Sequence, residues 1–227
     1  MPQNSIFDEF ISKEVNEDSI ALTWFNDYSG FAIKSTKGTI LIDPYDISEE
    51  DAKSISADMV LVSHGHPDHF NKKLLKEISP KMTVTTPSIA KKLKDGDVRA
   101  LLPGESIEGE IKILAEKAVH PAMNPITFVI QIGRIVLYHM IDSMNFDELK
   151  GIGEKHDLDI AIVPIGIAPG TSPKKGAKAV GMLSPKVAIP HHTKKGFEEF
   201  EEAVKKQNLG TDVAILQKGE VYTYSKR

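Results

Sequence analysis

The sequence contains no cysteine among its 227 residues. That absence excludes disulfide bonds, thiolate metal ligands, cysteine-held iron–sulfur clusters and a cysteine nucleophile. It agrees with the reducing interior of a cell, and we expect a cytoplasmic protein. Any metal ion in this protein must therefore be held by nitrogen and oxygen donors.

Long hydrophobic runs and an excess of positive charge are also lacking. The most apolar stretch, residues 126–141, is interrupted by Gln131, Arg134 and His139, and the N-terminus has no basic start before an apolar core. We therefore expect neither a membrane span nor a signal peptide.

Lys and Arg number 28 against 32 Asp and Glu, which gives a net charge of −4. Such a chain lacks the broad cationic surface that nucleic-acid binders use, so nucleic acid is not the expected partner.

The composition, with 41% hydrophobic and 26% charged residues, is that of an ordinary globular protein. Short β-rich runs over residues 20–43 predict a β-meander, and apolar runs then alternate with helical patterns. A helix is predicted over 146–154 behind a capping box of Asn145 and Glu148, and another over 173–183 behind Thr171 or Ser172. The two last apolar runs, around Lys218-Gly219, predict a terminal hairpin.

We find no internal repeat and no linker, so residues 1–227 are predicted to form a single domain, with two sheets sandwiched by helices. Within it, residues 1–18 allow a short amphipathic helix that carries Phe7 and Phe10. That helix would pack on its own domain or on a second subunit, so the sequence allows a homo-oligomer without requiring one.

Eight histidines are present, and three of them lie in the stretch SHGHPDH at residues 63–69. This stretch follows an apolar run at 59–62, typical of a buried strand, and precedes a helical pattern. Its four potential metal ligands are His64, His66, Asp68 and His69. Side chains two apart in an extended loop point the same way, so His64 and His66 can reach one ion while the next turn directs the other two ligands to a second. A solvated loop with incidental histidines is the weaker interpretation, because three histidines and one aspartate follow a buried apolar strand within six residues. Imidazole and carboxylate are donors that Zn²⁺ accepts.

The pattern His64-x-His66-x-Asp68-His69 resembles the signature of the metallo-β-lactamase superfamily, and the resemblance extends over most of the chain. The fragments LIDP at 41–44, VPIG at 163–166 and PKVAIP at 185–190 are similar to the branch of small metal-dependent hydrolases that includes ascorbate-6-phosphate lactonase. The resemblance implies an α/β fold, a four-layer αββα sandwich of the metallo-β-lactamase type. It also implies an enzyme, a metal-dependent hydrolase.

The same resemblance implies a binuclear site. The first ion would be held by His64, His66 and His120, and the second by Asp68, His69 and His192, with Asp142 bridging the two. His191 and His192 are adjacent and point in opposite directions if their strand continues, so we expect only one of them to bind metal. Register with the family favours His192, and His191 is the alternative.

Three positions depart from the family's common residues. Ile141 stands where glycine often precedes the bridging aspartate, Thr193 stands where tyrosine often follows the last histidine, and Asn26-Asp27 replaces a frequent Gly-His. None of these changes removes an expected metal ligand. The loss of tyrosine removes a hydrogen-bond donor for a developing oxyanion.

The implied cofactors are two divalent ions, with Zn²⁺ favoured and Mn²⁺ or Fe²⁺ as alternatives, and no organic cofactor is expected. Two ions about 3.5–4 Å apart would lower the pKa of a bridging water toward ~7 and so supply a hydroxide nucleophile. Asp68 is the predicted catalytic residue, which steers that nucleophile and passes a proton to the leaving group. The ions supply a charge of about +4, and the two carboxylates with hydroxide supply about −3, which leaves the site with a net charge of about +1. Such a site favours a small-molecule substrate that is anionic, namely a lactone or ester with or without a phosphate group.

Two other functions are open from the sequence. A phosphodiesterase acting on nucleotides or RNA uses the same kind of site, although the net charge of −4 disfavours it. A metal-binding regulatory protein without turnover is an alternative of another class. Measurement of the metal content distinguishes an enzyme, with two equivalents per chain, from a relative that has lost metal binding. Activity on lactones or on phosphodiesters distinguishes the predicted hydrolase from the phosphodiesterase.

Several other residues have two interpretations. Asp43 before Pro44 is either a turn residue or the hydrogen-bond acceptor of a ligand imidazole. The lysine pairs at 174–175 and 194–195 are ordinarily solvated surface, and one of them is a candidate to meet an anionic substrate. We expect His139 in the core and His156 in solvent.

Overall fold

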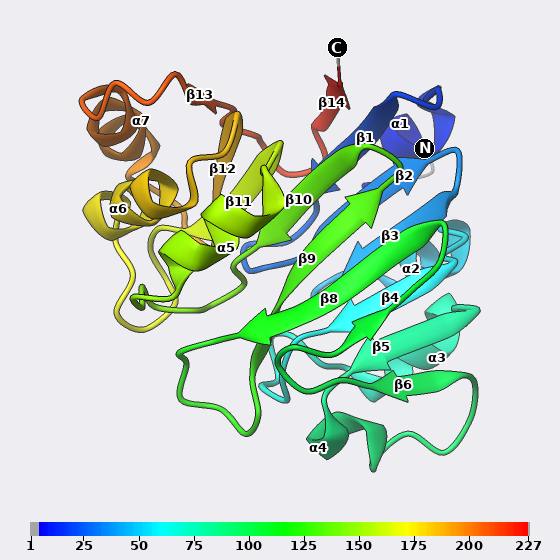
Figure 1. The fold of residues 1–227 in the computed structure, drawn as a ribbon. Helices are drawn as coiled ribbons and strands as arrows, with labels where there is room; N and C mark the ends of the chain where they lie inside the picture. The colour runs from blue at the N-terminus through cyan, green and yellow to red at the C-terminus, as the bar shows by residue number, and fades with distance from the viewer. Residues whose placement is uncertain (1–4, 227) are drawn as a thin grey trace. The chain divides into compact units, whose positions relative to one another are not determined.

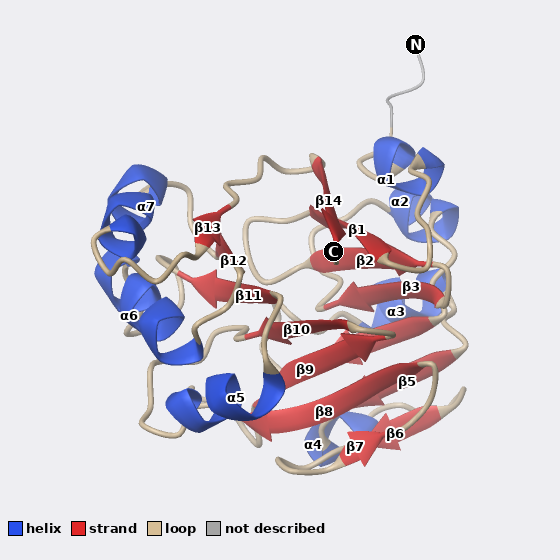
Figure 2. Ribbon diagram, turned by 45° about the horizontal axis from the view of Figure 1, so that its top comes forward, coloured by secondary structure: helices blue, strands red, loops and turns tan. Residues whose placement is uncertain are grey.

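The computed structural model describes residues 5–226, and the chain divides into two compact units (Figure 1). Unit 1 comprises the chain up to Leu102, Ala122–Asn124 and the chain from Leu216, and unit 2 comprises Pro103–Pro121 and Pro125–Ile215. Each unit contains one seven-stranded sheet with its own helices (Figure 2). The single domain over 1–227 stays a prediction.

Unit 1 begins with an antiparallel meander and continues as a parallel sheet. Its helices are α1 (Asp8–Ser12), α2 (Glu49–Ser54), α3 (Lys72–Ile78) and α4 (Pro87–Ala90). Its strands are β1 (Ser19–Trp24), β2 (Phe31–Ser35), β3 (Gly38–Ile42), β4 (Met59–Val62), β5 (Met82–Thr85), β6 (Val98–Ala100) and β14 (Val221–Ser225). The order in the sheet is β14-β1-β2-β3-β4-β5-β6, parallel from β3 to β6. The predicted meander is confirmed in β1, β2 and β3.

The helices of unit 1 bury apolar side chains against one face of this sheet. Val60 and Val62 are two residues apart on β4 and therefore point to the same face, where they share a cluster with Leu74 of α3. Phe7 and Phe10 are 0% and 1% exposed in the same cluster. The predicted N-terminal helix is thus observed as α1 and packs on its own unit, whereas residues 1–4 of the predicted segment lie outside the described residues.

Unit 2 follows the same progression along the chain, with antiparallel strands first and parallel strands after them. Its strands are β7 (Ser106–Ile107), β8 (Ile111–Lys117), β9 (Ile126–Ile132), β10 (Ile135–His139), β11 (Ile160–Pro164), β12 (Val187–His191) and β13 (Asp212–Val213). Its helices are α5 (Leu149–His156), α6 (Pro173–Leu183) and α7 (Phe197–Lys205). The sheet order is β13-β12-β11-β10-β9-β8-β7, and β10 to β13 are parallel.

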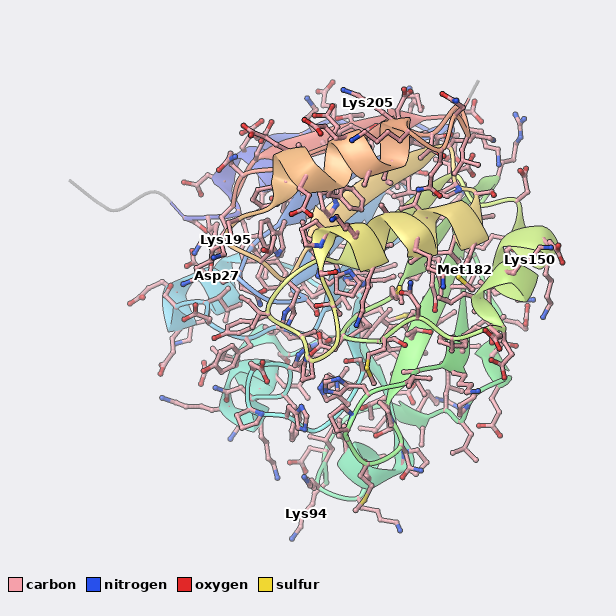
Figure 3. The ribbon with its side chains drawn as sticks, turned by 90° about the vertical axis from the view of Figure 1, so that its left-hand side faces the viewer. Asp27, Lys94, Lys150, Met182, Lys195 and Lys205 are labelled. Atoms are coloured by element: carbon pink, nitrogen blue, oxygen red, sulfur yellow. The ribbon has the colours of Figure 1, made fainter. Side chains whose placement is uncertain are left out.

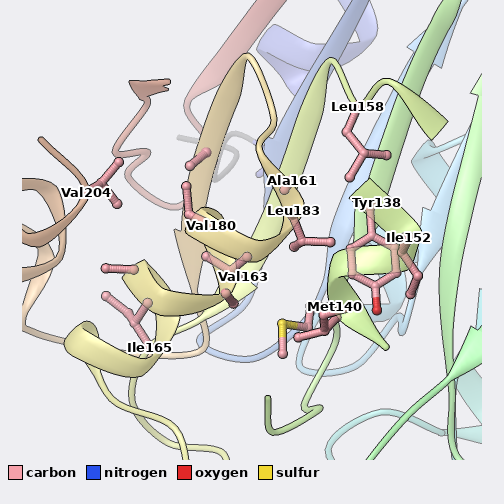
Figure 4. Close-up of a cluster of buried hydrophobic side chains, with 14 of the residues drawn as sticks. Tyr138, Met140, Ile152, Leu158, Ala161, Val163, Ile165, Val180, Leu183 and Val204 are labelled. Atoms are coloured by element: carbon pink, nitrogen blue, oxygen red, sulfur yellow. The ribbon is translucent and has the colours of Figure 1, made fainter. Parts of the chain in front are cut away.

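The core of unit 2 lies between its sheet and its three helices (Figure 4). Tyr138 and Val163 from the sheet meet Val180 and Leu183 of α6, and all four are fully buried. The opposite sides of the helices carry charge, so Lys150 on α5 and Lys205 on α7 project away from the ribbon (Figure 3). Such one-sided helices are what the sequence periodicity predicts.

Two predicted elements are wrong in detail. The two last apolar runs form no hairpin, because β13 pairs with β12 in unit 2 while β14 pairs with β1 in unit 1. The helix predicted over 146–154 begins at Leu149 instead, since Glu148 makes no side-chain cap and the Asn145 amide donates to the carbonyl of Lys175. By contrast, α6 spans 173–183 as predicted, with the Ser172 hydroxyl accepting from the Lys175 N–H. No helix among residues 5–226 is long and apolar enough to cross a bilayer.

A carboxylate of unit 1 gives a testable pH dependence. Asp58 accepts hydrogen bonds from the Thr39 N–H at 2.8 Å and the Lys81 ammonium at 2.6 Å. Partial burial acts to raise the pKa of Asp58, but these two hydrogen bonds outweigh it and hold the pKa below the ordinary value. A carboxyl group with a lowered folded-state pKa stabilises the fold above its unfolded pKa, and this contribution is lost as the pH falls through the folded value.

We expect Asp58→Asn to lower the free energy of unfolding by about 1 kcal/mol at pH 7. The difference from the wild type should shrink as the pH falls below the ordinary carboxyl range, because the wild-type side chain then also becomes neutral. Urea denaturation over a pH series measures both effects. A difference that stays constant down to the lowest pH at which the protein folds would contradict the expected role of the charge.

Candidate metal centre

The histidine loop of unit 1 connects β4 to α3 and is held by its own backbone. The N–H groups of His69 and Phe70 both donate to the carbonyl of His66, at 3.1 and 3.0 Å. The loop ends where the Asn71 side chain caps α3 by accepting from the N–H groups of Lys73 and Leu74. The turn and the cap together fix the direction of the side chains between them.

The four predicted ligands of this loop come together. His64 Nε2 lies 3.1 Å from His66 Nδ1, and Asp68 Oδ2 lies 3.8 Å from His69 Nε2. One nitrogen of His64 and one of His69 lie within 4.8 Å of each other. His64 and His69 are buried, whereas His66 and Asp68 are half-buried. This His/Asp cluster is able to bind metal ions.

Asp43 orients the two buried histidines of the cluster. It follows β3, which is parallel to β4, so the carboxyl ends of the two strands meet at one sheet edge. Asp43 Oδ2 lies 2.7 Å from His69 Nδ1 and accepts from the Ser63 hydroxyl at 2.7 Å, while Oδ1 accepts from the Ser63 N–H at 2.8 Å. Of the two interpretations of Asp43, the hydrogen-bond acceptor is confirmed.

Ser63 extends this effect to His64. Its hydroxyl donates to Asp43 and therefore has a lone pair left for His64 Nδ1, which lies 2.9 Å away. With both Nδ1 atoms donating, His64 and His69 keep the lone pairs of their Nε2 atoms for a cation. Ser63 was not among the residues predicted at the site, although a hydroxyl directly before the first histidine of the motif was a signal.

In unit 2, the other three predicted ligands also come together. His120 follows β8, Asp142 follows β10 and His192 follows β12, three strands that run in the same direction. Asp142 Oδ1 lies 3.2 Å from His192 Nε2, and Asp142 Oδ2 lies 3.9 Å from His120 Nε2. All three side chains are at most 4% exposed. Asp142 thus has a different imidazole beside each of its carboxylate oxygens.

The backbone is strained at two places in this group, at Ile141 directly before Asp142 and at His192 itself. Ile141 has φ 54° and His192 has φ 56°, in the left-handed region that glycine favours. A β-branched residue at positive φ is rare, so the structure explains why glycine is common at position 141. The turn is held by the Ile141 N–H, which donates to His139 Nδ1 at 3.0 Å.

The remaining histidines have separate roles. The ring of His191 packs perpendicular to that of His139 at 4.8 Å between centroids, and both are fully buried, as we expected of His139. His191 thus packs against His139, whereas His192 makes the contact with Asp142. His156 was expected in solvent, and that is wrong: its side chain is 16% exposed, 3.9 Å from Glu116. Burial lowers the pKa of His156 and raises that of Glu116.

Asn26 and Thr193, at the two other positions that depart from the family pattern, make hydrogen bonds within the fold. Asn26 is fully buried, accepts from the N–H groups of Tyr28 and Gly30 at 2.9 Å and donates to the carbonyl of Tyr45. The Thr193 hydroxyl donates to the carbonyl of Lys195 at 2.6 Å. These contacts give both residues a structural role.

The two lysine pairs of unit 2 have different surroundings. The Lys175 ammonium donates to the carbonyl of Gly170, and Lys174 lies 4.0 Å from Glu199. Lys194 and Lys195 line a cavity of about 600 Å³ together with Thr193. A role of either pair in binding an anion stays a prediction.

A family model described as "Beta-lactamase superfamily domain" matches residues 21–192, a range that contains every predicted ligand. The chain belongs to the metallo-β-lactamase superfamily. Within that superfamily it is 32% identical over 225 residues to a UPF0173 metal-dependent hydrolase of Pelotomaculum thermopropionicum, covering 86% of this chain and 96% of the relative. It is 31% identical over 231 residues to a UPF0173 metal-dependent hydrolase of Staphylothermus marinus, covering 90% and 100%.

A solved structure shows the same fold. The metallo hydrolase Igni18 from Ignicoccus hospitalis superposes with a TM-score of 0.83 at 23% identity, over 92% of this chain and 100% of that one. The predicted α/β fold of the metallo-β-lactamase superfamily is therefore confirmed, as is the predicted branch of small metal-dependent hydrolases.

Proposed function

We propose that this metal-dependent hydrolase uses a pair of divalent cations to cleave a small anionic ester or lactone. The proposed ligands are His64, His66, His120, Asp68, His69, His192 and the bridging Asp142. The observation that carries the proposal is the Asp142 carboxylate, whose two oxygens lie 3.2 and 3.9 Å from two different imidazoles. A buried carboxylate must be paired or coordinate a metal ion, and a cation between each oxygen and its imidazole would meet this need.

The chemistry of the donor set fits two divalent cations. Nitrogen donors outnumber carboxylates, which favours Zn²⁺, while Mn²⁺ and Fe²⁺ are alternatives for the same set. In unit 1, His64 Nε2 and His66 Nδ1 are 3.1 Å apart, close enough to share one ion. In the sequence, only Pro121 separates His120 from Ala122, which lines a cavity with His66 in unit 1.

When bound, such cations lower the pKa of a coordinated water and polarise a carbonyl or phosphoryl oxygen. The chain's own residues prepare the site for this chemistry. Asp43 and Ser63 hold His69 and His64 with their Nε2 atoms available. Asp68 is the proposed proton carrier: its side chain is 32% exposed, so its carboxylate can take a proton from the attacking water and give it to the leaving group.

Metal analysis and a substrate panel test this function. We expect two equivalents of metal per chain and turnover of lactones or aryl esters, with little turnover of bis-aryl phosphodiesters. His66→Ala should lose turnover on every substrate, because its imidazole is a ligand. Turnover of phosphodiesters alone would indicate the phosphodiesterase instead, and a metal-free protein that added Zn²⁺ or Mn²⁺ leaves unchanged would indicate a regulatory protein. The cytoplasmic location and a homo-oligomer stay predictions.

A further inference from the structure

A cavity of about 320 Å³ lies beside His66 within unit 1. It is lined by Gly65, His66, Ser88, Lys92, Ala122 and Met123. One wall is tied in place by Ser88, whose hydroxyl lies 2.9 Å from that of Thr86 and donates to the carbonyl of Met123 at 3.4 Å. A proposed metal ligand therefore opens onto a space of the size that a small substrate fragment needs.

Lys92 places a positive charge at this cavity. Its ammonium lies 6.0 Å from the centroid of the Phe70 ring, and a Cβ built on Gly65 would be 3.8 Å from Nζ. The charge thus lies next to the backbone of the histidine loop. The backbone of Lys92 is anchored by the Lys72 ammonium, which donates to the Lys92 carbonyl at 2.8 Å. Within residues 5–226, the interactions of Lys92 include no ion pair with a carboxylate.

Met123 gives the cavity an apolar side. Met123 is 73% exposed, more than any other large hydrophobic residue among residues 5–226. An unbranched thioether adapts to apolar groups of different shape. The cavity therefore combines one cation, one adaptable apolar surface and one proposed metal ligand.

We propose that Lys92 determines substrate specificity by binding an anionic group of the substrate, a carboxylate or phosphate, while Met123 covers the apolar segment between that group and the scissile bond. This inference rests on the proposed function and names the residue that selects the anionic substrate. Lys92 takes no part in proton transfer or metal binding. Its loss should therefore weaken binding of the anionic substrate and leave the chemical step intact.

Two p-nitrophenyl esters with the same leaving group test the proposal: the neutral butyrate and the carboxylated mono-succinate. In Lys92→Gln we expect kcat/KM for the succinate ester to fall about fivefold, through KM, as for one partly exposed ion pair. The neutral ester should stay within about twofold of the wild type. Lys91→Gln is the matched control, since Lys91 is the exposed neighbour, carries the same charge and does not line the cavity.

A binding measurement separates this inference from the proposed function. Calorimetric titration of succinate into the metal-loaded protein should show affinity about fivefold weaker in Lys92→Gln than in the wild type and in Lys91→Gln. Equal losses on both esters, or unchanged affinity for succinate, would overturn the role of Lys92. If the wild type hydrolyses neither ester, the proposed esterase activity fails, whereas the titration still decides whether Lys92 binds the anion.

Discussion

Replacing Asp142 with asparagine is expected to reduce turnover at least about 1,000-fold, because a ligand to catalytic cations is worth several kcal/mol and each 1.36 kcal/mol is about a factor of ten. The amide has nearly the shape of the carboxylate but no charge, and one of its two atoms is a donor. That NH₂ group would face the Nε2 of either His120 or His192, in place of an oxygen that can bind a cation. Metal content should fall below two equivalents per chain.

The matched control for this substitution is Asp147→Asn. Asp147 follows Asp142 by five residues, is exposed and makes the same change of charge. We expect metal content and turnover of the control to equal those of the wild type. Steady-state kinetics and elemental analysis of the three proteins decide the matter, and an Asp142→Asn variant with two metals and full activity would remove Asp142 from the site.

Sequence patterns predicted correctly those elements that are specified by residues of the same segment. The helix over 173–183 is specified by its cap, its proline and its apolar face, all within the segment itself. The terminal hairpin failed for the opposite reason. The turn at Lys218-Gly219 is read correctly from the sequence, but the partner of each strand depends on sheet edges formed by residues far away, Val187 for β13 and Thr23 for β14.

The candidate site shows the same division. A motif of four potential ligands within six residues is visible in the sequence, and the adjacency of His191 and His192 predicted that only one of them binds metal. The hydrogen bond from His69 to Asp43 joins residues 26 positions apart, so the sequence could offer it only as one of two interpretations. Lys92 has no local signal at all, because its relation to Gly65 exists only in the folded chain.

Asp43→Asn should weaken metal affinity about 10- to 100-fold, the usual effect of removing the hydrogen-bond acceptor of a ligand histidine. Asp43 Oδ2 accepts from both His69 Nδ1 and the Ser63 hydroxyl. If the asparagine oxygen keeps the bond to the Ser63 N–H, its NH₂ group faces two donors. His69 then favours the tautomer with the proton on Nε2, and the Nε2 lone pair is no longer free to bind a metal ion.

A buried control distinguishes this effect from a general loss of stability. Asp159 is also 0% exposed, and it accepts from the Val136 N–H and the Lys186 ammonium in unit 2. Both Asp43→Asn and Asp159→Asn should lower the free energy of unfolding by about 1–3 kcal/mol, because each removes the charge of a buried hydrogen-bond acceptor. Only Asp43→Asn should weaken metal affinity, measured by competition with a chromogenic chelator. Equal affinities in the two variants would mean that Asp43 supports the fold without orienting His69 or selecting its tautomer.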